Sequence, residues 1–282
     1  MWVAAVGCQA AVARLTPVPL LIGYRQAMTY KSRTPALTRF DAVDALRGLA
    51  MVWMTAYHFC FDLNHFGYIR QDFYSDPFWT WQRTLILSLF LFCAGMGQAI
   101  AVAQGQSWPR FWRRWAQVLG SALLVTMGSW LMYPQSFIYF GVLHGIALML
   151  IIARLTTRWG GWLWLLGGVA IAFKYIASYA LETGAFALFA DVFNGRQLNW
   201  LGLITRKPVT EDYVPLIPWL GVMWWGVAAG HWLSSHGAAC LSWQLPEVGQ
   251  LLARLGRWSL SYYVLHQPVM IGALLALGWF VK

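Results

Sequence analysis

One stretch of the chain combines several ionisable residues with an otherwise apolar, helix-length sequence. Residues 39–67 read RFDAVDALRGLAMVWMTAYHFCFDLNHFG and contain Asp44, Arg47, His58, Asp62 and His65. A charge at the centre of a bilayer costs about 3 kcal/mol on insertion scales, so ionisable residues within a membrane span usually mark a functional site. This segment is therefore the first candidate for chemistry.

His58 and Asp62 are four residues apart, so a helix places them on neighbouring turns of one face. A carboxylate in that position can accept the ring N–H, fix the tautomer and raise the basicity of the imidazole. This spacing predicts His58 as a general base that Asp62 orients, with His65 at the end of the same face. The alternative is an interhelical hydrogen bond from the histidine, with Asp62 at the surface.

Asp44 and Arg47 are three residues apart and can pair at the start of this helix. One interpretation is a fixed cation that faces a phosphate-bearing ligand, and the other is an arginine that snorkels to the headgroups. Arg47 and His58 are eleven residues apart, which corresponds to about 16 Å of helix. The two candidate groups therefore lie toward opposite ends of the helix.

Further polar residues occur in or beside other apolar segments. His144 stands in YFGVLHGIALML, and His266 stands in SLSYYVLHQPVM beside Tyr263 and Gln267. A single histidine in a membrane usually makes an interhelical hydrogen bond, but several at similar depth favour a shared polar cavity. We expect this cavity to bind a substrate through six residues: His144, His266, Tyr263, Gln267, Asp212 and Trp219.

The composition is that of a membrane protein. Hydrophobic residues make up 59% of the chain, charged residues only 11%, and the mean hydropathy is +0.53; soluble domains have about 25% charged residues. The net charge of +10 comes from bases in short loops, which excludes nucleic-acid binding as its explanation. The four scattered cysteines imply neither a metal site nor a disulfide framework.

Apolar runs of about 20 residues predict an all-α, polytopic bundle of seven spans. We expect the segment 1–38 to be a poorly ordered N-terminal tail, with translation starting at Met28 as our hypothesis, and residues 39–282 to form the transmembrane domain. Glycines in two of the spans, among them Gly95, Gly97, Gly221, Gly226 and Gly230, are attributed to close helix packing. The predicted spans are 45–65, 80–103, 112–133, 137–153, 160–179, 214–233 and 256–280.

The distribution of basic residues predicts a cytoplasmic N-terminus. With this orientation the inner side holds most of the basic residues, and the outer side holds fewer, mixed with acids in 180–213. The helix from Arg47 to His58 would then run from the cytoplasmic side outward.

Five blocks in order, FDAVDALRGLAMVWMTAYHFCFDL, FLFCAGMGQAI, YFGVLHGIAL, DYVPLIPWLGVMWWGVAAG and LGRWSLSYYVLHQPV, carry a family resemblance. Together they resemble the heparan-alpha-glucosaminide N-acetyltransferase catalytic-domain family, including its bacterial members, within the transmembrane acyltransferase superfamily. The resemblance implies transfer of an acetyl group from cytoplasmic acetyl-CoA to an amine or hydroxyl of a sugar on the outer side. It also implies a role for Arg47 and Asp44 on the CoA side, and location in a bacterial-type inner membrane.

The chain departs from the animal enzymes at one position. Those enzymes have Asn where His58 stands and carry their catalytic histidine after the first helix, in the region of His65. The assignment of the base to His58 or His65 therefore stays open, as do the acceptor and the oligomeric state, with a homodimer among the alternatives. A proton-coupled transporter, with the histidines and Asp62 as a relay, is the alternative function.

Overall fold

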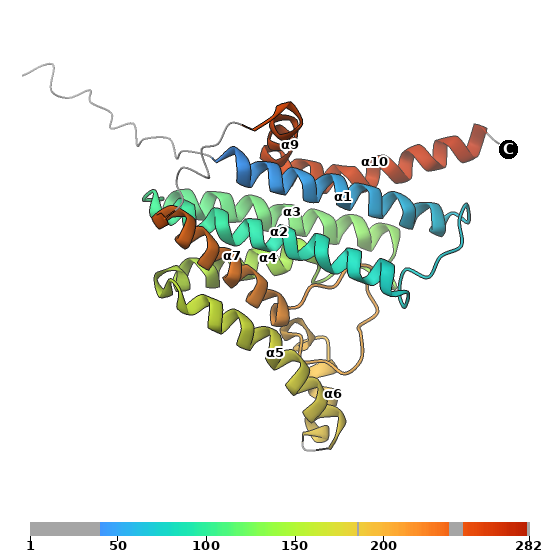
Figure 1. Cartoon of the computed structure of the whole chain (residues 1–282). Helices are drawn as coiled ribbons and strands as arrows, with labels where there is room; N and C mark the ends of the chain where they lie inside the picture. The colour runs from blue at the N-terminus through green and yellow to red at the C-terminus, as the bar shows by residue number, and fades with distance from the viewer. Residues whose placement is uncertain (1–39, 185, 237–244, 281–282) are drawn as a thin grey trace, which may run out of the picture. The chain divides into compact units, whose positions relative to one another are not determined.

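The computed structural model describes residues 40–184, 186–236 and 245–280, and Figure 1 shows their helices. Within these ranges all regular structure is helical apart from one isolated parallel bridge between Phe140 and Tyr213. The predicted tail and the hypothetical start at Met28 lie outside the described residues. The prediction of an all-α polytopic membrane protein is confirmed.

Each of the seven predicted spans coincides with a long helix. Five are long and apolar enough to cross a membrane: α2, α3, α4 with the following turn η1, α5 and α10. The long helices and this turn are α1 (Asp41–His65), α2 (Pro77–Ala103), α3 (Trp108–Met132), α4 (Val142–Thr156), η1 (Thr157–Trp159), α5 (Trp162–Glu182), α7 (Leu216–His236) and α10 (Ser259–Phe280).

Helices α1 and α7 have the length of a span but a less apolar composition. They contain 25 and 21 residues, and the ionisable residues of α1 lower its hydropathy. Both pack along α2. Their crossing of the bilayer, and hence the count of seven, stays a prediction.

Two boundaries differ from the predicted ones. The fourth helix begins at Val142 rather than 137, because the residues before the N-cap Gly141 include the extended bridge residue Phe140. The segment before the last span contains a separate helix, α9 (Glu247–Arg257), which ends at Trp258 before α10 begins. Helix α9 is short and amphipathic, so it contains no apolar run that would predict a span.

Glycines allow α2 and α7 to approach closely, as predicted for Gly95 and Gly226. A Cβ on Gly95 would lie 2.2 Å from the carbonyl oxygen of Met223, and one on Gly226 would lie 2.2 Å from that of Phe92. Such distances exclude any larger residue unless the helices separate. The apolar cluster between α2, α4, α5 and α7 includes the buried side chains of Leu91 and Met149.

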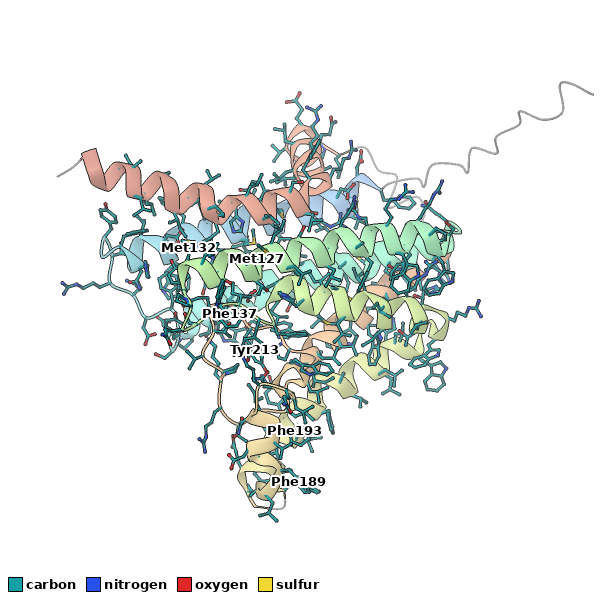
Figure 2. All side chains as sticks on the ribbon, turned by 180° about the vertical axis from the view of Figure 1, so that it is seen from behind. Met127, Met132, Phe137, Phe189, Phe193 and Tyr213 are labelled. Carbon is teal, nitrogen blue, oxygen red and sulfur yellow. The ribbon has the colours of Figure 1, made fainter. Side chains whose placement is uncertain are left out.

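The connection between α5 and α7 contains three short helical turns, η2 (Ala187–Phe189), α6 (Ala190–Asn194) and η3 (Asn199–Leu201). Phe137 and Tyr213 lie on the loops at the base of this connection in Figure 2, and Phe189 and Phe193 lie at its far end. Asn199 donates to the Tyr139 hydroxyl at 2.7 Å, which ties the connection to the segment before α4.

Candidate active site

The predicted polar face of α1 points mostly into the protein. Met51, Met54 and Asp62 are buried, His58 and Arg47 are half-buried, and His65 is exposed. The helix begins with Asp41 and Asp44 in its first turn, where carboxylates stabilise the helix dipole. It ends at Phe66, where Gly67 adopts a positive φ of 81°.

Helix α10 packs along α1 (Figure 1). Three polar contacts join the two helices. The Thr55 and Tyr262 hydroxyls are 2.7 Å apart, and one turn further along α1 the rings of His58 and His266 lie 5.3 Å apart, centroid to centroid. In the next turn Asp62 contacts Gln267. Residues separated by about 200 positions in the chain therefore form one polar site.

The hydrogen bonding of His266 defines its tautomer. Its Nδ1 lies 2.7 Å from the backbone oxygen of Tyr263, and because a carbonyl can only accept, Nδ1 carries the proton. The Nε2 of His266 is buried and has no hydrogen-bond partner in the described part of the chain. The ring of Tyr262 stacks on His266 with centroids 5.9 Å apart and an interplanar angle of 6°, which limits its rotation.

Asp62 is 3% exposed and is held by α10 rather than by His58. The Nε2 of Gln267 donates to Asp62 Oδ1 at 2.7 Å. Asp62 Oδ2 and Gln267 Oε1 are buried and have no hydrogen-bond partner among the residues that the structure describes. Among the described residues, no hydrogen bond joins His58 to Asp62. Asp62 therefore lies one turn from His58 with one oxygen bound and the other unpaired.

Arg47 lies at the other end of α1 in a small network of charges. It donates to Asp44 Oδ1 at 2.8 Å, and Asp44 Oδ2 lies 3.7 Å from Nε of Arg257 in α9. Arg257 also donates to Asp41 at 2.6 Å. The predicted pairing of Asp44 with Arg47 is present. Within residues 40–184, 186–236 and 245–280 it is the one hydrogen bond of Arg47, which leaves further guanidinium donors for an anion.

The predicted substrate residues Tyr263 and Trp219 lie in different places. Tyr263 packs against an apolar cluster formed by α3 and α4, and its ring lies 5.7 Å from that of His266, centroid to centroid. Trp219 instead packs against the apolar cluster of α2, α4, α5 and α7. The contacts therefore connect Tyr263, but not Trp219, to the α1–α10 site.

His144 and Asp212 both serve the N-terminus of α4. Asp212 accepts from the Val142 N–H at 2.7 Å, and His144 lies 3.3 Å from the Gly141 nitrogen and 3.1 Å from the Thr126 hydroxyl. Burial raises the pKa of Asp212, although this hydrogen bond opposes the shift. These contacts fix the start of a helix, where unpaired N–H groups need acceptors.

Two parts of this arrangement had no signal in the sequence. Thr55 and Tyr262 are ordinary residues of apolar helices, and Arg257 closes a short amphipathic helix. These residues take part in the site through contacts between helices that are far apart in the sequence. The spacing of residues within one segment cannot predict such contacts.

Comparison with known proteins gives the family. A family model described as "Heparan-alpha-glucosaminide N-acetyltransferase, catalytic" matches residues 39–268, which include α1, the polar site and most of the other helices. Searches of curated proteins and of solved structures gave no match. The match extends from before Arg47 to just beyond Gln267 and so covers both ends of α1 and its contact with α10. The chain belongs to the heparan-alpha-glucosaminide N-acetyltransferase catalytic-domain family, a family of membrane acetyltransferases.

Proposed function

We propose that residues 39–282 form a membrane-embedded acyltransferase that moves an acetyl group from cytoplasmic acetyl-CoA to an amino or hydroxyl group of a sugar on the outer side. The observation that carries this proposal is the contact of His58 with His266, beside the Asp62–Gln267 pair. Family membership supports the reaction class.

His58 is the proposed general base. Its half-buried ring lies in the polar site, where it can take the proton of the attacking amine or hydroxyl. The deprotonated nitrogen or oxygen of the acceptor then attacks the acetyl carbon, and the C–S bond of the thioester breaks. The CoA thiolate leaves and takes up a proton. Asp62 and His266 supply the polar surroundings of this step.

Arg47 is the proposed contact for the CoA phosphates. It lies about 16 Å from His58 along α1, and a bidentate guanidinium suits phosphate oxygens. Asp44 holds Arg47 in place through its hydrogen bond. A cytoplasmic Arg47 follows from the predicted orientation in a bacterial-type inner membrane.

His65 is the alternative base. It is exposed at the end of α1, and its ring contacts Phe66 at a centroid distance of 5.4 Å. Among the described residues it has no ring contact with His58 or His266. We therefore favour His58 and keep His65 as the comparison in the experiment.

The test uses the purified full chain with acetyl-CoA and an amino sugar such as glucosamine. We expect acetyl-CoA binding in the micromolar range and acetylglucosamine detected by mass spectrometry. His58→Ala should lower the transfer rate by about 100-fold or more, whereas His65→Ala should change it little. The reverse result would move the base to His65, and sugar flux into proteoliposomes without CoA would favour a transporter.

A further inference from the structure

A cavity of about 550 Å³ opens at the turn between α4 and α5. Its lining combines one cation, Arg158 of η1, with three apolar side chains, and the four lining residues are Arg158, Trp159, Trp162 and Leu166. The volume lies within the range of about 300–1,000 Å³ that is typical of small-molecule sites. These residues are distinct from those proposed for acetyl transfer.

The turn that forms the cavity is fixed by contacts with α7. The backbone oxygen of the buried Thr157 accepts from Nε2 of His231 at 2.6 Å, and the Trp224 indole donates to the Thr156 hydroxyl at 3.0 Å. Gly160 has a positive φ of 55°, which allows the chain to reverse directly into α5. The cavity therefore belongs to the fold itself and is formed before any ligand binds.

The end of the bundle that contains this cavity is basic. Residues 77–181 contain neither aspartate nor glutamate, although they include Arg154 and Arg158 beside the turn. Arg154 donates to Gln106 at 3.3 Å and lies 4.9 Å from the centroid of a Trp108 ring, which joins the turn to the α2–α3 connection (Figure 1). In the described part of the chain no carboxylate pairs with Arg158. The cavity is therefore suited to an anion.

The cavity also lies at the end of an apolar face of α5. The residues of this face recur at intervals of three and four positions and are each 45% to 71% exposed: Trp162, Leu165, Val169, Phe173 and Ile176. Because α5 is long and apolar enough to cross a membrane, such an exposed face contacts acyl chains. Tryptophan is enriched where acyl chains meet headgroups, so the cavity lies at the depth of the headgroups.

We propose that the α4–α5 turn binds an anionic phospholipid, with its phosphate on Arg158 and its acyl chains along the exposed face of α5. A guanidinium can bind two phosphate oxygens through parallel hydrogen bonds, and Trp159 and Trp162 border the glycerol region. In the predicted orientation this lipid belongs to the inner leaflet. A zwitterionic headgroup adds a cation that Arg158 repels, and a free phosphate ester lacks the chains that contact α5.

The test measures binding of three probes to the full chain in non-ionic detergent by native mass spectrometry. The probes are phosphatidylglycerol, phosphatidylcholine with the same acyl chains, and glycerol phosphate without chains. We expect phosphatidylglycerol to bind at least about fivefold more tightly than phosphatidylcholine, and glycerol phosphate to bind more weakly than both lipids. Equal affinities for the two lipids would overturn the proposal. Glycerol phosphate that binds as tightly as phosphatidylglycerol would replace the lipid by a soluble phosphate ester.

Arg158→Gln locates the phosphate. The variant should weaken phosphatidylglycerol binding by about tenfold or more, because a charge-assisted hydrogen bond is lost. Arg113→Gln is the matched control, since Arg113 is also exposed at the start of α3 but does not line the cavity. It should change the affinity by less than about threefold. Equal weakening in the two variants would show that the overall positive charge, and not this cavity, attracts the lipid.

Trp162→Ala tests the aromatic wall of the cavity. Trp162 and Trp81 are 71% and 65% exposed on long apolar helices, so Trp81→Ala is the control for loss of an exposed indole. Loss of apolar contact should weaken phosphatidylglycerol binding by at least about threefold in Trp162→Ala alone. An unchanged affinity in Trp162→Ala would contradict the placement of the lipid in this cavity. Unfolding temperatures equal to that of the wild type establish that the four variants are folded.

Discussion

Gly256 of α9 packs directly on the backbone of Asp44 in α1, and a Cβ at position 256 would lie 1.9 Å from the Asp44 carbonyl oxygen. The same contact holds the following residue, Arg257, beside Asp41 and Asp44. Gly48 approaches Leu252 equally closely, so the two helices meet through glycine on both sides. The charged end of α1 therefore depends on the position of α9.

Gly256→Ala should separate α9 from α1 and destabilise the protein. Overpacking of this kind costs about 1–3 kcal/mol, which thermal unfolding in detergent would detect as a lower midpoint. Gly272→Ala in α10 is the matched control, because nothing lies within 4 Å of its added Cβ. That control should be neutral or stabilising by up to about 1 kcal/mol, and a similar loss in both variants would disprove the close contact.

Arg47→Gln should raise the KM for acetyl-CoA more than it lowers kcat. A lost charge-assisted bond to phosphate corresponds to about tenfold or more in affinity, while His58 lies far along the helix. Steady-state kinetics with varied acetyl-CoA measures both constants.

Arg257→Gln is the comparison for Arg47→Gln. The Arg257 side chain is 41% exposed, and its partner Asp41 is 49% exposed, so their ion pair contributes about 0.2–1 kcal/mol. We expect a small change in unfolding temperature and an unchanged KM. A KM raised equally in both variants would place Arg257 at the CoA site as well.

Asp212 should make stability depend on pH. Burial raises its pKa above the ordinary 3.8, so the folded state binds the proton more tightly than the unfolded state. The stabilising contribution is therefore complete below pH 3.8 and is lost as the pH rises through the folded-state pKa.

Asp212→Asn should remove this dependence, because an amide does not titrate, while its oxygen still accepts from the Val142 N–H. Unfolding temperatures of both proteins across the acidic range give the difference. A wild-type protein whose midpoint rises with pH relative to Asp212→Asn would contradict the raised pKa.

The sequence predicted the helical fold well because membrane spans are long and almost uniformly apolar. The fourth helix began later than expected, since Gly141 and Phe140 belong to an extended segment. Helix α9 was not predicted because its eleven residues include Glu247, Arg254 and Arg257 and so lack an apolar run.

The polar site was predictable in part. The spacing of ionisable residues on α1 predicted His58 and Asp62 as site residues. His266 was predicted because a histidine is unusual in an apolar span. Their mutual contact, and the pairing of Asp62 with Gln267 rather than with His58, depend on the register of α1 against α10. Periodicity within one helix carries no information about that register.

The stacking of Tyr262 on His266 allows a test of whether acetyl transfer requires a fixed orientation of the His266 ring. Tyr262→Phe keeps the ring and loses only the hydroxyl contact with Thr55, whose own hydroxyl still donates to the Met51 carbonyl at 2.8 Å. We expect a destabilisation of about 0.5–1.5 kcal/mol and a nearly unchanged transfer rate.

Tyr262→Leu removes the stacked ring, so His266 can rotate and its Nε2 no longer has a fixed position. Misplacement of a group by about 1 Å can cost up to about 100-fold in rate, and we expect kcat for acetyl transfer to fall by at least about tenfold. Measurement of kcat together with the unfolding temperature separates this effect from a loss of folded protein. Equal loss of kcat in the Phe and Leu variants would assign the role to the hydroxyl, because only the hydroxyl is absent from both.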